Sequence, residues 1–250
     1  MSKYLDINGR GHSVKCKLYS SNNHAIDKLI VFGHGFGGHM DNKYAELFSE
    51  KVLKHAAVLV FNWPCHGNDI KKKLTLDDCM TYIDLILEHM AEHYGVKEFY
   101  GYGISFGAYL FLTYIASHGN PFVRTALRCP ALDMYPLMTT RIMNEAGREL
   151  IEKGREAEVG FDRKVKIGPS FLQELQANDI TKNDYIDYAD DLIIVHGNAD
   201  EIVPVTRSRE FAEDNVIEFY EIDGADHRFR DIAKMAEADK IVIRFFDLAH

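Results

Sequence analysis

The sequence predicts an α/β protein with a mostly parallel central sheet, helices on its flanks and a helical insertion. Short apolar runs recur along the chain, as expected of strands that are buried on both faces of a parallel sheet. Segments of helical period separate these runs, and this alternation is typical of βαβ units. One long segment lacks strand-like runs and therefore indicates an insertion.

Each expected element has its own pattern. Residues 12–20 alternate between polar and apolar side chains, which suits an early antiparallel strand. The other expected strands are residues 28–33, 57–62, 98–103, 191–197 and 216–223. The expected helices are residues 42–55, 75–94, 107–117, 206–213 and 231–248.

The segment 131–188 breaks this alternation. It is rich in Met and charged residues and reads as short amphipathic helices, and it is too long for a plain connection. We therefore expect a core made of residues 1–130 and 189–250, with residues 131–188 inserted as a helical cap. The methionines of the cap either form the core of the cap itself or provide an adaptable lining for an apolar substrate. They are Met134, Met138 and Met143.

Composition narrows the possible partners. The 250 residues carry a net charge of −9, which disfavours binding to nucleic acid or to anionic membrane surfaces. We interpret the run of lysines at 71–73 as a solvated loop. Four scattered cysteines without a C-x-x-C pair suggest free thiols in a reducing compartment. Without a secretory signal or a membrane-spanning run, we expect a cytoplasmic protein, monomeric or homodimeric, acting on a small molecule.

The most specific motif is Gly103-Ile104-Ser105-Phe106-Gly107, a G-x-S-x-G sequence between an expected strand and an apolar helix. A nucleophilic serine in this context sits on a tight, strained turn, and glycines two residues away prevent collisions. The turn also aims the backbone N–H of Phe106 at the reacting carbonyl. The motif therefore predicts Ser105 as a nucleophile.

A nucleophilic serine needs a base, and the base needs an orienting acid. Asp200 follows the expected strand 191–197, and His227 follows the strand 216–223, so both lie at the sheet edge that carries Ser105. We expect Asp200 to be the acid and His227 the base. Asp223 and Asp226 are the competing acids.

The order of these motifs resembles that of the α/β-hydrolases. The sequences HGFGG, GISFG, HGNADEIVP and GADHRF are similar to the oxyanion loop, nucleophile elbow, acid loop and histidine loop of that superfamily. Within it, the chain resembles the monoacylglycerol lipase and cinnamoyl (feruloyl) esterase group, whose helical cap follows the sixth strand. The resemblance implies that the Phe36 and Phe106 amides form the oxyanion hole. Asn62 and Asn68 depart from the usual Asp and Ser of the neighbouring loop.

The Gly-rich turn allows a second interpretation. Gly33, Gly35 and Gly38 also fit the G-x-G-x-x-G spacing of a dinucleotide-binding loop. That site requires an acidic residue about 20 residues later to hold the ribose, but the next strand ends in Asn62. The oxyanion-loop interpretation is therefore favoured.

One further motif invites a metal interpretation. His89, Glu92 and His93 form H-x-x-E-H, an inverted zinc-peptidase pattern. No third ligand is evident, and the helix end should lie opposite Ser105. We therefore expect a partly buried histidine pair, with no metal and no organic cofactor.

These observations predict a serine hydrolase that cleaves carboxylic esters with short, medium or hydroxycinnamoyl-type acyl groups. A thioesterase or a serine aminopeptidase on the same three residues are the enzymatic alternatives. An aminopeptidase would need acids that converge on the substrate ammonium, and the candidates are Asp133, Glu145, Glu149 and Glu152. The alternative that is not an enzyme is a ligand-binding protein with the same fold.

Overall fold

The computed structural model describes residues 1–21, 26–69 and 73–248. Its eight-stranded sheet has the order β1-β2-β4-β3-β5-β6-β9-β10. β2 pairs antiparallel with β1 and β4, and the remaining pairs are parallel. The strands are β1 (Ser2–Gly9), β2 (His12–Tyr19), β3 (Lys28–Gly33), β4 (Ala57–Phe61), β5 (Glu98–Ile104), β6 (Arg124–Arg128), β9 (Leu192–Gly197) and β10 (Glu218–Ile222).

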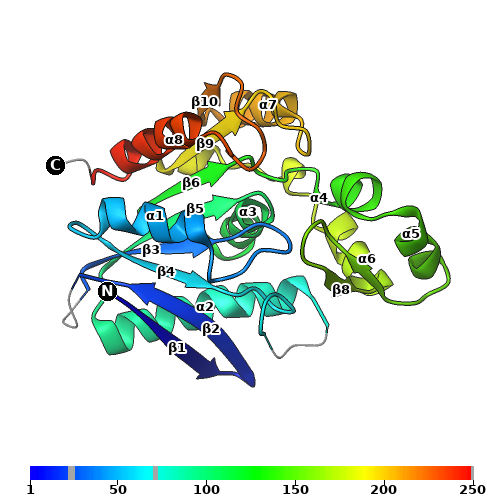
Figure 1. The fold of residues 1–250 in the computed structure, drawn as a ribbon, viewed down its shortest axis with the longest axis horizontal. Helices are drawn as coiled ribbons and strands as arrows, with labels where there is room; N and C mark the ends of the chain where they lie inside the picture. The colour runs from blue at the N-terminus through cyan, green and yellow to red at the C-terminus, as the bar shows by residue number, and fades with distance from the viewer. Residues whose placement is uncertain (22–25, 70–72, 249–250) are drawn as a thin grey trace.

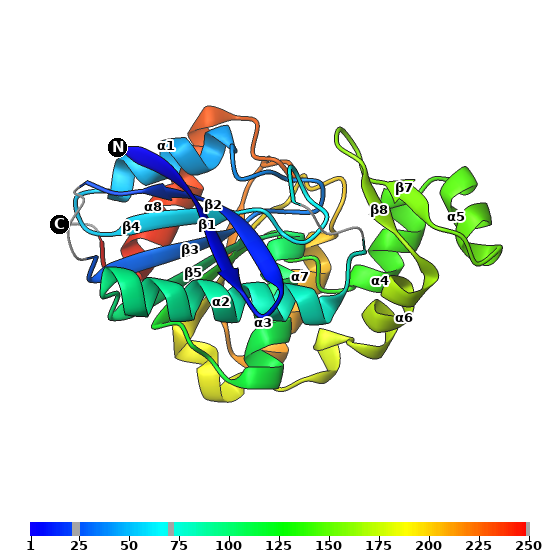
Figure 2. The ribbon, with the colours of Figure 1, turned by 90° about the horizontal axis from the view of Figure 1, so that it is seen from below.

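Two hydrophobic clusters cover the two faces of this sheet (Figures 1 and 2). The helices α1 (Lys43–Val52) and α8 (Ile232–Phe245) pack on one face. The helices α2 (Leu76–Tyr94), α3 (Phe106–His118) and α7 (Val205–Asn215) pack on the other. Because both faces are covered, β3, β4 and β9 are almost entirely buried, which explains their continuous apolar runs.

The predicted strands and helices are confirmed, but two strands of the eight-stranded sheet were not predicted. β1 is an exposed edge strand whose side chains are mostly polar. β6 has only three residues between two arginines, so its apolar run is too short to stand out. The lysine run 71–73 lies mostly outside the described residues.

Residues 134–177 lie beyond the carboxyl ends of the parallel strands in both views of the ribbon, and the chain then returns to the start of β9 (Figures 1 and 2). The segment contains short helices, as expected, and also a two-stranded antiparallel hairpin between them that was not predicted. Each strand has only three residues, buried at both ends and exposed in the middle, which is too short to show a period. The elements are α4 (Met134–Leu137), a π turn (Met138–Ile142), α5 (Glu145–Glu152), β7 (Ala157–Val159), β8 (Val165–Ile167), α6 (Pro169–Ala177) and 3₁₀ turns at Ile180–Lys182 and Ile186–Asp191.

None of the helices within the described ranges is long and apolar enough to cross a bilayer.

Candidate active site

Ser105 stands at the turn between β5 and α3 with φ 53° and ψ −111°, a strained conformation for a residue with a side chain. The two glycines of the motif make this turn possible. A Cβ on Gly103 would lie 2.6 Å from Ala108 Cα, and a Cβ on Gly107 would lie 2.2 Å from the carbonyl oxygen of Gly33. The backbone therefore packs too closely for any larger residue at either position.

The Gly-rich turn after β3 lies against this serine. A Cβ on Gly35 would lie 3.4 Å from Ser105 Cβ and 3.9 Å from its Oγ. The rings of Phe36 and Phe106 pack edge to face with their centroids 5.5 Å apart. Within the described ranges, the backbone N–H groups of Phe36 and Phe106 donate no hydrogen bond. The turn thus borders the serine, and its Phe36 amide and the Phe106 amide are without an acceptor in the described part of the chain.

Asp200 and His227 meet in the loops after β9 and β10. His227 Nδ1 lies 2.7 Å from Asp200 Oδ2, and the carboxylate is fully buried. Asp200 Oδ1 accepts the backbone N–H groups of Ile202 and Val203 at 2.8 and 2.7 Å. Burial alone would raise the pKa of Asp200, but hydrogen bonds from His196 and His227 outweigh it and hold this pKa far below its usual range. Asp200 is therefore held as a carboxylate against the His227 ring.

The competing acids have other partners. Asp223 accepts a hydrogen bond from Asn198 Nδ2 at 3.0 Å. Asp226 pairs with Arg230 at 2.6 Å. The structure thus favours Asp200 over both as the partner of His227.

Sequence reasoning did not single out His196, the second ring on Asp200. His196 Nε2 lies 3.0 Å from Asp200 Oδ2, and its Nδ1 lies 2.8 Å from Ser208 Oγ. Its position in the HGNADEIVP sequence was the available signal.

Cys129, His196 and Asp200 hold their ligand-type atoms within 4.8 Å of one another, close enough for a metal ion. The donor set fits a metal poorly. Both Asp200 oxygens already accept hydrogen bonds. We interpret the cluster as support for the carboxylate.

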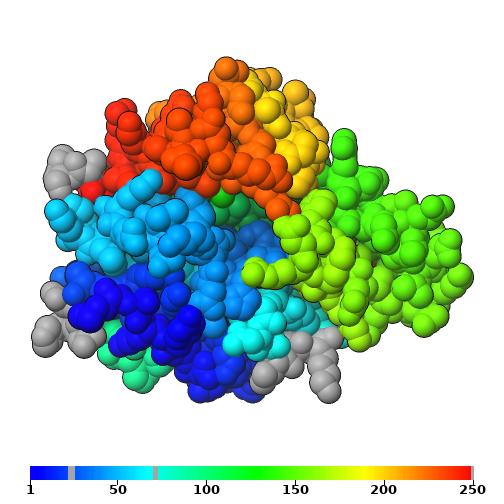
Figure 3. Space-filling model, viewed as in Figure 1, coloured from blue at the N-terminus to red at the C-terminus, as the bar shows by residue number. Residues whose placement is uncertain are grey.

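Ser105 and His227 line the same cavity of about 600 Å³. Its walls come from the Gly-rich turn, the start of α1, the ends of β5 and β6, the β7–β8 hairpin tip and the loops after β9 and β10. The space-filling view shows a hollow here, between the blue N-terminal part, the orange C-terminal loop and the yellow-green hairpin (Figure 3). No hydrogen bond joins Ser105 Oγ to His227 in the part of the chain that the structure describes.

The loop beside the turn is tied together by polar groups. Asn62 accepts the Met40 N–H at 2.7 Å and donates to Asn68 Oδ1 at 2.7 Å, so the two asparagines that depart from the family pattern bond to each other. Trp63 Nε1 donates to the carbonyl oxygen of His34 at 2.9 Å. His34 and His66 are buried with ring centroids 5.4 Å apart.

The remaining candidates do not line the cavity of Ser105. His89 and His93 stack at 4.2 Å on the last turns of α2, near the amino end of β3, and His93 is exposed where partial burial was expected. Asp133 pairs with Arg207 at 2.7 Å. The exposed Glu145, Glu149 and Glu152 do not line the 600 Å³ cavity. The inserted methionines Met134, Met138 and Met143 are buried core residues.

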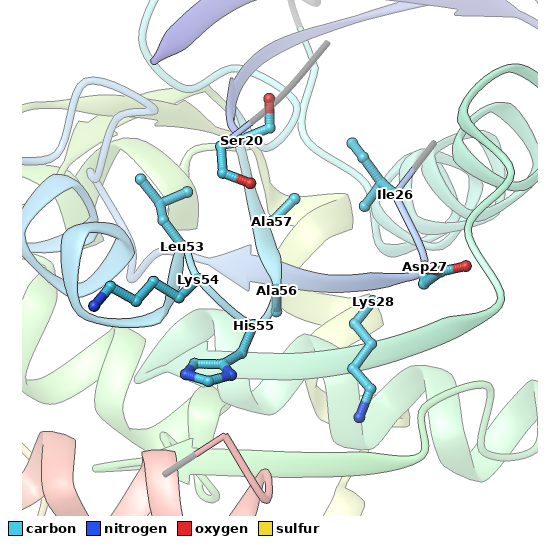
Figure 4. Close-up of a pocket in the computed structure, with 10 residues that line it drawn as sticks. Ser20, Ile26, Asp27, Lys28, Leu53, Lys54, His55, Ala56 and Ala57 are labelled. Carbon is cyan, nitrogen blue, oxygen red and sulfur yellow. The ribbon is translucent and has the colours of Figure 1, made fainter. Parts of the chain in front are cut away.

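A second hollow of about 240 Å³ lies at the opposite edge of the sheet (Figure 4). Residues at the end of β2, the start of β3 and the α1–β4 connection line it, with Lys28, Lys54 and His55 among them. Ser105 and His227 do not line this hollow; both line the 600 Å³ cavity.

Residues 24–183, more than half of the chain, match the family model described as serine aminopeptidase, S33. The chain belongs to this S33 family. The match includes the Gly-rich turn and Ser105 but ends before Asp200 and His227, whose pairing comes from the structure. A comparison with curated protein sequences gave no match.

Solved structures confirm the α/β-hydrolase fold of this S33 member. Est1E from Butyrivibrio proteoclasticus, solved with bound ferulic acid, has a TM-score of 0.77 at 20% identity, covering 97% of this chain and 99% of that one. The mouse α/β-hydrolase domain-containing protein 10 has a TM-score of 0.73 at 18% identity and covers 98% of both chains. XC6422 from Xanthomonas campestris, described as an α/β serine hydrolase without a lid, has a TM-score of 0.66 at 15% identity, with 98% and 94% covered.

Proposed function

We propose that this protein hydrolyses carboxylic esters through an acyl-enzyme on Ser105. The observation that carries the proposal is one cavity that holds the Ser105 hydroxyl and an imidazole anchored to a buried carboxylate. Phe106 follows Ser105 in the chain, Phe36 lies in the turn that packs against Ser105, and the backbone N–H groups of both donate no hydrogen bond among the described residues. These are the nucleophile, the base, the orienting acid and the oxyanion donors that acyl transfer requires.

Each group then has a defined step. His227 Nε2 removes the proton of Ser105 Oγ while the oxygen attacks the ester carbonyl. Asp200 holds the imidazole tautomer through Nδ1 and stabilises the imidazolium. The two amides bind the developing oxyanion, each contributing about 3 kcal/mol. The alcohol leaves with the proton from His227, and water, activated by the same imidazole, releases the acid.

The charges around the cavity favour an ester over an aminopeptidase substrate. A free peptide N-terminus is a cation and needs carboxylates near the serine. The four acidic residues that could have supplied them do not line the cavity. Asp162 does line it but pairs with Arg228, and three arginines line the same cavity. We therefore propose that this S33 member acts on esters, although the family is described by its aminopeptidases.

We propose that residues 131–188 act as a cap and select the acyl group. Phe161 from the hairpin tip and Ile142 from the π turn line the cavity and would contact that group. A volume of about 600 Å³ suits a short, medium or hydroxycinnamoyl-type acyl chain.

The four cysteines are free, as expected for the cytoplasmic location that we propose.

A substrate panel tests this function. Methyl cinnamates and p-nitrophenyl esters of increasing acyl length are compared with matched thioesters and aminoacyl p-nitroanilides. We expect the highest kcat/KM on an ester. A preference for thioesters or aminoacyl anilides would replace the proposal with that activity, and turnover of none would favour a ligand-binding role.

A further inference from the structure

The walls of the 600 Å³ cavity carry positive charge. Arg128, Arg163 and Arg228 line it, and Asp162 is the carboxylate among the same lining residues. The whole protein, by contrast, has a net charge of −9. A concave site with a charge opposite to that of its protein concentrates ligands of the complementary sign.

Arg128 is the most informative of the three, because it is only 4% exposed. Its guanidinium lies over the rings of Tyr44 and Phe229, at 4.3 and 5.1 Å from their centroids. Nη1 donates to the weak acceptor Met235 Sδ at 3.1 Å, and the buried Nε has no hydrogen-bond partner. Within the described ranges, no carboxylate forms an ion pair with Arg128. A buried guanidinium normally has such a partner.

Asp239, a buried carboxylate on the same face of the sheet, is already engaged. One of its oxygens accepts the Tyr44 hydroxyl at 2.7 Å, and the other pairs with Lys51. Asp239 thus leaves the hydrogen-bonding capacity of Arg128 unused.

The other two arginines, Arg163 and Arg228, also line the cavity. Arg163 comes from the tip of the β7–β8 hairpin and forms no hydrogen bond or ion pair through its side chain in the described part of the chain. Arg228 follows His227 and pairs with Asp162 at 2.6 Å. Arg163 is exposed and free to contact a ligand in the cavity.

We propose that the ester carries a carboxylate group, which Arg128 binds inside the cavity and which Arg163 attracts at its mouth. This inference rests on the proposed function. Arg128 pairs in register with Ile104, the residue before Ser105, and both Arg128 and Ser105 line the cavity, so one substrate can contact both residues. The planar guanidinium suits a carboxylate because it donates two parallel hydrogen bonds.

Two pairs of esters test the proposal and distinguish the position of the charge. Monomethyl glutarate and its neutral isostere methyl glutaramate place the group on the acyl side. O-acetylglycolate and O-acetylglycolamide place it on the alcohol side. In the pair whose charge lies on the correct side, we expect the carboxylate ester to have a kcat/KM about tenfold above that of the amide. One charged hydrogen bond has an effect of this size.

The variants assign the preference to residues. In Arg128→Met the ratio should fall to about one, and in Arg163→Ala it should fall several-fold. Arg155→Ala is the matched control, because Arg155 is an exposed arginine of the inserted segment outside the cavity. Its ratio should equal that of the wild type. Circular dichroism establishes that each variant is folded. If Arg128→Met does not fold, the Arg163→Ala variant still tests the proposal, because Arg163 is exposed.

Binding to the Ser105→Ala protein, measured by calorimetry, separates this inference from the function itself. A carboxylate ester that binds about tenfold more tightly than its amide supports the anion site, even if the wild type hydrolyses no ester. Ester turnover with no preference in either pair, together with equal binding of carboxylate and amide, would overturn the anion site and leave the esterase proposal standing. A ratio that persists in both arginine variants would also overturn it.

Discussion

Gly107 lies directly against the carbonyl of Gly33, so that a Cβ on Gly107 would sit 2.2 Å from that oxygen. This contact joins the first turn of α3 to the end of β3 and fixes the Gly-rich turn beside Ser105. Both neighbouring atoms belong to the backbone, which cannot move aside as a side chain can.

We therefore expect Gly107→Ala to lower the free energy of unfolding by more than about 3 kcal/mol, because overpacking against backbone displaces whole elements. Gly168→Ala is the matched control, since its Cβ would meet only the flexible Glu156 side chain at 3.7 Å. That variant should stay within about 1 kcal/mol of the wild type. Urea unfolding measures both, and equal stabilities would show that the turn is looser than described.

A second prediction concerns Asp200. Asp200→Asn should lower kcat by about 10²- to 10⁴-fold, because the amide favours the wrong tautomer of His227 and no longer stabilises the imidazolium. Asp223→Asn, at the competing acid beside Asn198, should keep kcat within about twofold. Steady-state kinetics on the best ester of the panel compares the two, and a larger loss in Asp223→Asn would reassign the acid.

The buried histidines beside the Gly-rich turn predict how stability depends on pH. Burial lowers the pKa of His34 to about 3, helped by His66, and burial lowers the pKa of His66 to about 4. Between these values and the unfolded value near 6.5, the unfolded chain binds protons that the folded protein does not. Stability is therefore fully present above about pH 6.5 and decreases as the pH falls.

Each histidine should remove about 2 kcal/mol between pH 8 and pH 5. Replacing either one with Gln removes its contribution to this slope, even if the variant is less stable at every pH. Urea unfolding across this range gives the slopes. Equal slopes in the wild type, His34→Gln and His66→Gln would mean that water reaches both rings.

The sequence predicted best what local pattern determines. Apolar runs such as 28–33 and 57–61 identify doubly covered strands, because burial on both faces leaves no polar positions. The G-x-S-x-G motif identified Ser105 because a strained turn leaves few choices of residue around it. Asp200 and His227 followed from the rule that sites lie at the carboxyl edge of the sheet.

The sequence could not show what depends on distant neighbours. Arg128 follows Leu127 in a short strand, and only the fold reveals that the carboxylate on its face is taken by Tyr44 and Lys51. His196 differs, because it contacts Asp200 only four residues away, and the HGNADEIVP sequence was a local signal that was not used. The β7–β8 hairpin escaped prediction because its strands are shorter than any measurable period.

The central claim is that Ser105 is an activated nucleophile, and labelling with a fluorophosphonate followed by mass spectrometry tests it most directly. We predict one adduct on the peptide that contains Ser105, absent in Ser105→Ala and formed at least about 100-fold more slowly in His227→Ala. A folded protein that stays unlabelled, or an adduct that persists in Ser105→Ala, would contradict the claim.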